Sequence, residues 1–246
     1  MKGSIFALLL VLATTALWAD CPTCYFYGGD FGYVSPTARG YLYPNGLANE
    51  NDAYNGGDPY GAATYQNFVA AGGIRVTGLF TNNLSTLNPS TGYWEIRSGM
   101  SEGNGGTLIA SGTGAMTQTP TGRSGYGYTE YQDLVSGLSI NLTPDTYWFA
   151  VVPNDVNTPD GRSFNSNTTG WNSVGTQISN EQYFNSAFFA ADFTNANNDG
   201  DFPTLSSGVF AGSFHSVPAV PEPSSLVLLG SGLLGTAVAV RRRWFN

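Results

Sequence analysis

Between residues 20 and 216 the chain consists of short runs in which apolar and polar side chains alternate, and this period of two constrains the fold most. The pattern is clear at residues 74–77, 93–97 and 138–142. Alternation of this kind places the apolar side chains on one face of a β-strand. Helical periodicity with capping residues is hard to find in the same region. The sequence therefore predicts an all-β domain.

One run is different, because Tyr147 to Val152 is apolar on both faces and is flanked by Pro-Asp and Pro-Asn turn dipeptides. Such a run predicts a central strand that is covered on each side. Further strands are expected at residues 107–111, 125–132, 186–192 and 207–214. Many short strands joined by Gly, Asn, Pro and Thr predict an antiparallel β-sandwich, of jelly-roll kind. The strand order cannot be read from the sequence.

The charge of this region excludes some classes of partner. Of the 17 acidic side chains only Glu222 lies outside residues 20–216, while five arginines and no lysine lie inside. Five cations against sixteen anions give a formal charge of −11. A surface this acidic repels phosphate backbones, so we expect no nucleic-acid partner. About 200 residues are enough for one well-buried domain.

The N-terminal residues have the features of a cleavable secretory signal. Lys2 supplies a positive start, residues 5–13 form an apolar core too short to span a membrane, and small residues follow. We expect a signal peptide at residues 1–19, with cleavage after Ala19, or alternatively after Ala16. Cys21 invites a lipoprotein interpretation, but the charged Asp20 stands where a small residue is wanted.

The C-terminal residues have the composition of a marginal membrane span. Residues 224–240 are apolar or small, and as a helix they would extend about 25 Å, which barely crosses the apolar core of a bilayer. Three cations, Arg241, Arg242 and Arg243, follow directly and should stay cytoplasmic. The sequence thus predicts a single transmembrane helix that leaves the large domain outside, and an ordinary C-terminal anchor is the alternative.

Directly before this span lies the short motif Val220, Pro221, Glu222 and Pro223, whose prolines favour an extended and accessible backbone. The ordered combination of this motif, the glycine-interrupted apolar run and the arginine cluster resembles the PEP-CTERM sorting signal of Gram-negative bacteria that make exopolysaccharide. The resemblance is confined to residues 217–246. It implies an exosortase-type membrane enzyme as a partner, which cleaves near the Pro-Glu-Pro motif and holds the catalytic residues itself.

These features divide the chain into a signal peptide (1–19), a β-sandwich ectodomain (20–216) and a sorting and anchor segment (217–246). We expect a protein that is tethered to the inner membrane and then delivered to the cell envelope, outer surface or extracellular matrix. Its expected role is structural or adhesive. The alternatives are a carbohydrate-binding module for exopolysaccharide and, third, a glycoside hydrolase.

Cys21 and Cys24 have the spacing of a redox motif, but no βαβ pattern surrounds them. In an oxidising compartment the simpler expectation is a small disulfide loop at the mature N-terminus. Two cysteines alone cannot form a structural zinc site.

A calcium site is suggested by Asn195, Asn197, Asp199 and Asp201, with Gly200 between the last two. Oxygen ligands on alternate residues and a glycine open an EF-hand loop in this way, but Ser206 stands where such a loop needs a bidentate glutamate. We therefore expect no obligatory cofactor and keep calcium as a candidate ligand, with a solvated turn as the alternative. The acidic and amide-rich residues 49–52 are similarly ambiguous.

Tyr126, Tyr128 and Glu130 form the candidate ligand patch, because strand alternation would place them on one face with bare glycines between them. The aromatic pairs at 93–94 and 147–148 would suit stacking on sugars, although aromatic residues in sandwiches usually fill the core.

No catalytic residue is predicted, and we expect no enzyme. His215 is the single histidine and lies at the edge of the linker, which is a poor place for the base of a catalytic triad. A glycosidase needs two carboxylates about 5 to 10 Å apart. Glu95, Glu130 and Glu181 are the candidates, although carboxylates on an acidic surface are usually solvated.

Overall fold

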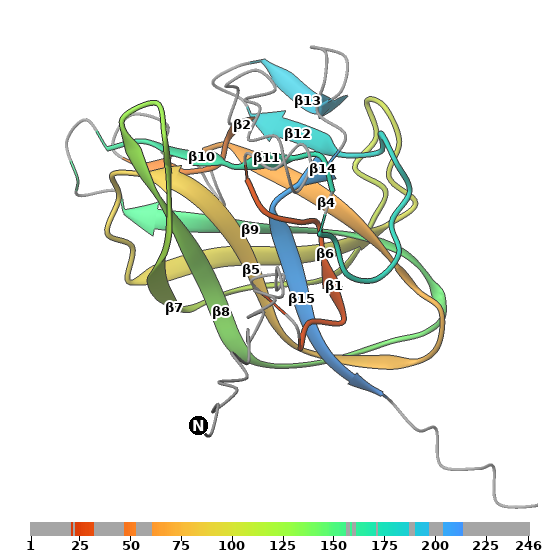
Figure 1. Ribbon diagram of the computed structural model, residues 1–246. Helices are drawn as coiled ribbons and strands as arrows, with labels where there is room; N and C mark the ends of the chain where they lie inside the picture. Colours follow the sequence, from red (N-terminus) through yellow and green to blue (C-terminus); the bar gives the residue numbers. More distant parts are fainter. Residues whose placement is uncertain are drawn as a thin grey trace, which may run out of the picture.

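The computed structural model describes residues 21, 23–31, 47–52, 61–155, 158, 161–170, 172–186, 190–196 and 204–213. This part of the chain is all-β, as the sequence predicts, and contains no α-helix (Figure 1). Accordingly, no helix within it has the length and apolar character needed to cross a bilayer. The predicted span at 224–240 and the signal peptide lie outside the described residues.

The strands, in chain order, are β1 (Phe26–Tyr27), β2 (Leu47–Ala48), β3 (Asn51–Asp52), β4 (Ala63–Ala70), β5 (Ile74–Ser85), β6 (Thr91–Ser98), β7 (Thr107–Gly125), β8 (Tyr128–Leu142), β9 (Asp145–Asp155), β10 (Ser163–Asn165), β11 (Asn167–Thr168), β12 (Tyr183–Ser186), β13 (Ala191–Asn195), β14 (Thr204–Leu205) and β15 (Ser207–Ser213).

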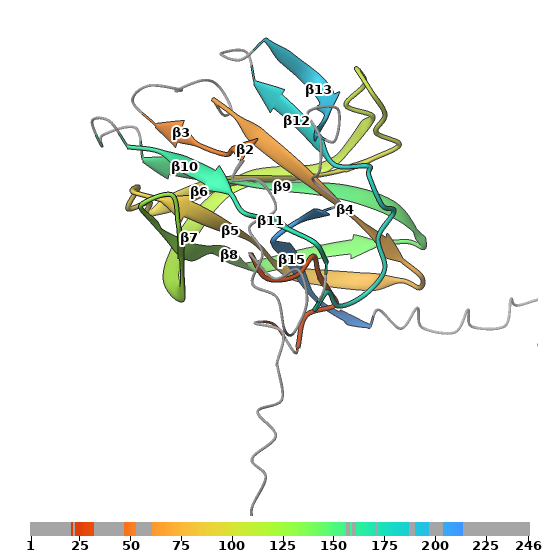
Figure 2. The ribbon, with the colours of Figure 1, turned by 45° about the horizontal axis from the view of Figure 1, so that its top comes forward.

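The main path of hydrogen-bonded strands runs β1-β15-β5-β8-β7-β6-β9-β4-β12-β13. Neighbours on this path are antiparallel, whereas the short β3 pairs with β9 in parallel. Figures 1 and 2 show the path folded over on itself, with β15, β5 and β8 in one layer and β6, β9 and β4 in the other. The jelly-roll classification stays a prediction.

Strand β7 connects the two layers. Its first half, Thr107 to Ala115, pairs with β6, and its second half, from Met116 onward, pairs with β8. Because β6 and β8 lie on opposite sides of β7, this one long strand passes from one layer to the other. Each half of β7 therefore pairs with a neighbouring strand along one edge and has no strand partner along its other edge among the described residues.

The space between the layers is apolar at one end. Phe68 of β4 lies at the centre of an aromatic group, and its ring centroid is 5.8 Å from that of Phe149 and 6.1 Å from that of Phe26. Ile96 of β6 and Leu79 of β5 pack into the same cluster and are fully buried. Burying such side chains stabilises the fold by about 1.5–3 kcal/mol each.

The expected strands at 74–77, 93–97, 107–111, 138–142 and 207–214 lie within β5, β6, β7, β8 and, except for residue 214, β15. Tyr147 to Val152 forms the buried middle of β9, between β6 and β4, so the prediction of a central strand is confirmed.

Two expected strands are wrong at their boundaries. Residues 125–132 span a hairpin turn, since β7 ends at Gly125 and β8 begins at Tyr128. Tyr126 and Gly127 have positive φ values of 54° and 86°, the conformation of a tight two-residue hairpin loop. Residues 186–192 likewise include the end of β12 and the start of β13, which pair as antiparallel neighbours.

Candidate functional site

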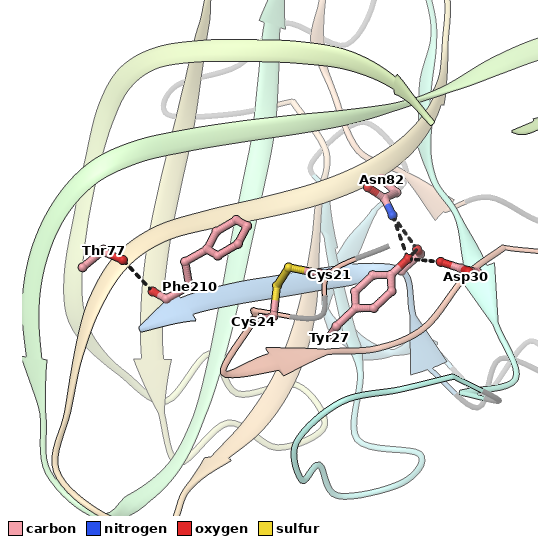
Figure 3. The surroundings of a disulfide bond; sticks show 8 residues. Cys21, Cys24, Tyr27, Asp30, Thr77, Asn82 and Phe210 are labelled. Atoms are coloured by element: carbon pink, nitrogen blue, oxygen red, sulfur yellow. Dashed lines mark hydrogen bonds between the residues drawn. A yellow bond between two sulfur atoms is a disulfide. The ribbon is translucent and has the colours of Figure 1, made fainter. Parts of the chain in front are cut away.

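The N-terminal segment, residues 23–31 together with Cys21, adds β1 beside β15 at the edge of one layer and packs against Phe80 of β5. Cys21 and Cys24 form a disulfide beside Tyr27 (Figure 3). The disulfide is almost completely buried and packs with Tyr27 against Phe80 of β5. The pair therefore fixes the segment to the sheet.

Polar side chains also connect the N-terminal segment to the neighbouring strands. The Tyr27 hydroxyl donates to Oδ1 of Asp30 at 2.7 Å, and Asn82 Nδ2 donates to the Tyr27 hydroxyl at 3.1 Å (Figure 3). Burial and the adjacent Asp30 carboxylate raise the pKa of Tyr27 well above its ordinary value. Arg123 then joins the segment to the β7–β8 hairpin, with Nη1 3.2 Å from Asp30 Oδ1.

Glu130, one residue of the predicted ligand patch, belongs to this buried network. Its side chain is completely buried, and Oε2 accepts hydrogen bonds from Arg123 Nε and from Thr121 Oγ1. The reason is its place in the sheet, because Glu130 pairs with the buried Leu84 under the N-terminal segment. The expectation of a solvated carboxylate is wrong here.

Of the two tyrosines in the predicted patch, Tyr128 lies two residues before Glu130 on β8 and shares its strand face, whereas Tyr126 does not. Tyr126 is an exposed turn residue, whereas Tyr128 opens β8 and packs edge-on against Phe164, with ring centroids 5.7 Å apart. The predicted common face is therefore wrong for Tyr126, because its turn interrupts the alternation, and it holds for Tyr128 and Glu130, although Glu130 is buried.

A second carboxylate is held on the outer face of the other layer. Glu95 of β6 is buried and accepts hydrogen bonds from the Tyr93 hydroxyl at 2.8 Å and from Arg97 Nε at 2.7 Å, as well as from the Tyr65 hydroxyl. The Arg97 guanidinium also lies 5.1 Å from the ring centroid of Phe193 of β13. Strands β12 and β13 thus close over this ion pair.

The remaining glycosidase candidate, Glu181, is partly buried and contributes its backbone carbonyl, which accepts from Trp148 Nε1 at 2.7 Å. Glu95 and Glu130 lie on different strands, and each has its own arginine and hydroxyl partners. The carboxylates of Glu95 and Glu130 therefore have separate structural surroundings. His215 lies outside the described residues.

Asp133 of β8 is a buried carboxyl that the sequence analysis did not single out. It lies between the layers at the polar end of the interior, where Asn83 Nδ2 donates to Oδ2 at 2.7 Å and Gln118 Nε2 donates to Oδ1 at 3.0 Å. Burial raises the pKa of Asp133 to about 7, against the lowering effect of the two amides.

Amide side chains extend this polar end across the interior. Asn49 Nδ2 donates to Asn83 Oδ1 at 3.2 Å, and Asn165 Nδ2 donates to Ser207 Oγ at 3.0 Å. All of these residues are buried. One sequence signal could have located these buried polar residues. Alternate residues of β5 point into the interior, and this alternation continues from Leu79 to Thr81 and Asn83.

The candidate calcium residues are only partly within the described chain. Asn195 ends β13, where its backbone N–H donates to Glu102 and its Nδ2 donates to the Asn180 carbonyl at 2.9 Å. Asn197, Asp199 and Asp201 lie outside the described residues. Within the part that is described, no three His, Cys, Asp or Glu side chains gather around a point that would suit a metal ion. Calcium binding stays a prediction.

The sorting residues Val220 to Pro223 and Arg241 to Arg243 also lie outside the described residues, and comparison with known proteins identifies them. A family model described as the PEP-CTERM protein-sorting motif matches residues 219–243. Comparisons with curated proteins and with solved structures gave no match. Such a motif implies export, anchoring in a membrane before processing, and an exosortase-type processing enzyme. The chain therefore carries an exosortase sorting signal behind an all-β domain.

Proposed function

We propose that the protein is a non-catalytic structural or adhesive component that exosortase-type processing delivers to the cell envelope, outer surface or extracellular matrix. The observation that carries this proposal is the sorting motif at residues 219–243. The motif implies export, and an exported all-β domain with a large negative charge suits a permanent position at a hydrated surface. The membrane is its partner before processing.

The surroundings of the buried carboxylates support a structural role. Glu95 is neutralised by Arg97, and Glu130 by Arg123, in both cases with hydroxyl groups as additional donors. A glycosidase instead needs two carboxylates on either side of an accessible substrate. The pair of Arg123 and Glu130 joins β7 to β8, whereas Arg97 and Glu95 both lie on β6. In either pair, removing one partner leaves an uncompensated buried charge. Exopolysaccharide binding stays a prediction.

The proposal is tested in producing cells that lack the protein. We expect matrix cohesion or surface attachment to fall, and to be restored by the full chain but not by a variant with Pro221, Glu222 and Pro223 replaced by alanine. The variant Glu181→Gln serves as the matched control for hydrolase activity, and it should restore cohesion fully. Unchanged cohesion without the protein, or turnover of polysaccharide by the purified chain, would contradict the proposal.

A further inference from the structure

One edge of β7 has no ladder partner among the described residues. From Thr107 to Ala115 this strand pairs with β6, whereas its pairing with β8 begins at Met116 on the opposite side. The backbone groups along the free edge of residues 107–115 therefore point away from the sheet. Such a row of N–H and C=O groups is a template for another strand.

This edge also lacks the features that normally protect a sheet edge. No charged residue occurs from Gly103 to Gly122, and no proline lies within residues 107–115. Leu108 and Ile109 are exposed by 47% and 43%. The ladder with β6 is irregular between Ile96 and Arg97, so the regular part of the edge is residues 110–115.

The other described edges are better protected. The second half of β7 carries Pro120 and Arg123, and its ladder with β8 has a register shift between Pro120 and Ser124. The edge of β8 at residues 136–142 contains Gly137, with a φ of 75°, and a register shift against β5. Strand β13, at one end of the sheet path, has five residues and includes the exposed Asp192. Strand β1, at the other end, has two residues and is held beside the disulfide. Charge, proline and short length are the usual means of preventing edge pairing. Residues 110–115 have none of these protective features.

We propose that two copies of the chain pair with each other, antiparallel, through the free edges of residues 107–115. This inference rests on the proposed structural role and names its partner as a second copy. Two strongly acidic domains repel each other over most of their surfaces, so an uncharged segment is where they can approach. Antiparallel pairing of identical strands is two-fold symmetric, which lets each copy satisfy the same backbone groups of the other.

The small side chains of this segment favour the close approach that pairing requires. Residues 110–115 are Ala, Ser, Gly, Thr, Gly and Ala. Strand β8, which occupies the adjacent edge from Met116 onward, limits how far a partner strand can extend. The pairing should therefore be short and centred between about Ser111 and Thr113.

Single cysteines test this geometry in the full exported chain, extracted with mild detergent. Ser111→Cys and Thr113→Cys place a thiol at exposed positions near the expected two-fold axis, while the native cysteines are bonded and buried. We expect a covalent dimer with a short bis-maleimide for at least one of them. Thr119→Cys, exposed on the same strand but beside β8, is the matched control and should give little dimer. Equal cross-linking at all three positions, or none at any, would overturn the proposal.

A charge variant adds an independent readout. Thr113→Lys should reduce the dimer fraction measured by analytical ultracentrifugation at least several-fold, because two-fold pairing brings like charges together. Thr119→Lys should leave that fraction unchanged, and circular dichroism checks the fold of both. A wild-type chain that is monomeric yet still supports matrix cohesion would overturn edge pairing and leave the structural role intact. A chain that dimerises, but whose loss leaves matrix cohesion unchanged, would support edge pairing and contradict the structural role.

Discussion

The tail at residues 219–243 and the β-domain before it are specified in different ways. The tail is a short ordered run of residue types that another enzyme reads along the chain. The domain depends on contacts between distant residues, such as Tyr27 with Ser206, which are 179 positions apart, and Asn49 with Val151. The comparison indicates that delivery and folding should be separable by mutation, and the predictions below test this separation.

The largest effect should come from moving the tail. We expect an unrelated exported domain that carries residues 217–246 to be processed and delivered, whereas the present chain without these residues should fold with the same melting temperature and be released. Cell fractionation with thermal melting measures both. If the unrelated domain carrying the tail is not processed, delivery and folding are not separable in the way proposed here.

Within the domain, Phe68→Ala should have the largest effect on stability and none on processing. Phe68 is fully buried among aromatic rings, and truncation of such a side chain typically costs about 3–5 kcal/mol of unfolding free energy. Urea denaturation measures the loss. Ile178→Ala, at an exposed position outside the proposed pairing edge, is the control and should change the unfolding free energy by less than about 0.5 kcal/mol.

Asp133 should make stability depend on pH. Burial raises the pKa of Asp133 from 3.8 to about 7 in the folded state, so between about pH 4 and pH 7 the folded state binds one more proton than the unfolded state. The unfolding free energy contributed by this group therefore falls as the pH rises through that window, by a few kcal/mol.

The variant Asp133→Asn removes this titration, and Gln118 can turn its amide to satisfy the new side chain because it is only half-buried. Denaturation at pH 5 and pH 8 should show that the wild-type protein loses more stability than the variant. Parallel pH profiles for the two proteins would show that the buried carboxyl is ionised throughout.

The disulfide should contribute least. A loop closed between Cys21 and Cys24 is short, so the loss of chain entropy that it imposes on the unfolded state corresponds to about 2 kcal/mol. Replacing both cysteines with serine should lower the unfolding free energy by about that amount. Reductant should then destabilise the wild-type protein but leave the variant unaffected, and sensitivity of the variant would point to a different cause.

The strands of the domain could be predicted where side chains alternate or where a run is apolar on both faces, as in β5, β6 and β9. Strand β7 could not be bounded, since its nineteen residues are mostly Thr, Ser, Gly and Ala and show no apolar face. The hairpin at Tyr126 is not predicted, because the sequence Gly-Tyr-Gly-Tyr has the alternating pattern of a β-strand. In the structure Tyr126 has a positive φ, which interrupts the strand.

The buried carboxylates could not be predicted at all. Arg97 lies two residues from Glu95, and Arg123 lies seven residues from Glu130, but this spacing does not show that the carboxylates are buried. Their burial depends on segments that return from elsewhere in the chain. Phe193 of β13 closes one site, and Asp30 of the N-terminal segment closes the other. The sorting residues could be predicted because their function depends on the order of consecutive residues in the sequence.

The central claim is that the tail makes this protein the substrate of an exosortase-type enzyme. Mass spectrometry of the mature protein from producing cells tests it most directly. The account predicts a C-terminus between about Pro221 and Ser224. Recovery of the final product with Arg241, Arg242 and Arg243 still attached would contradict it.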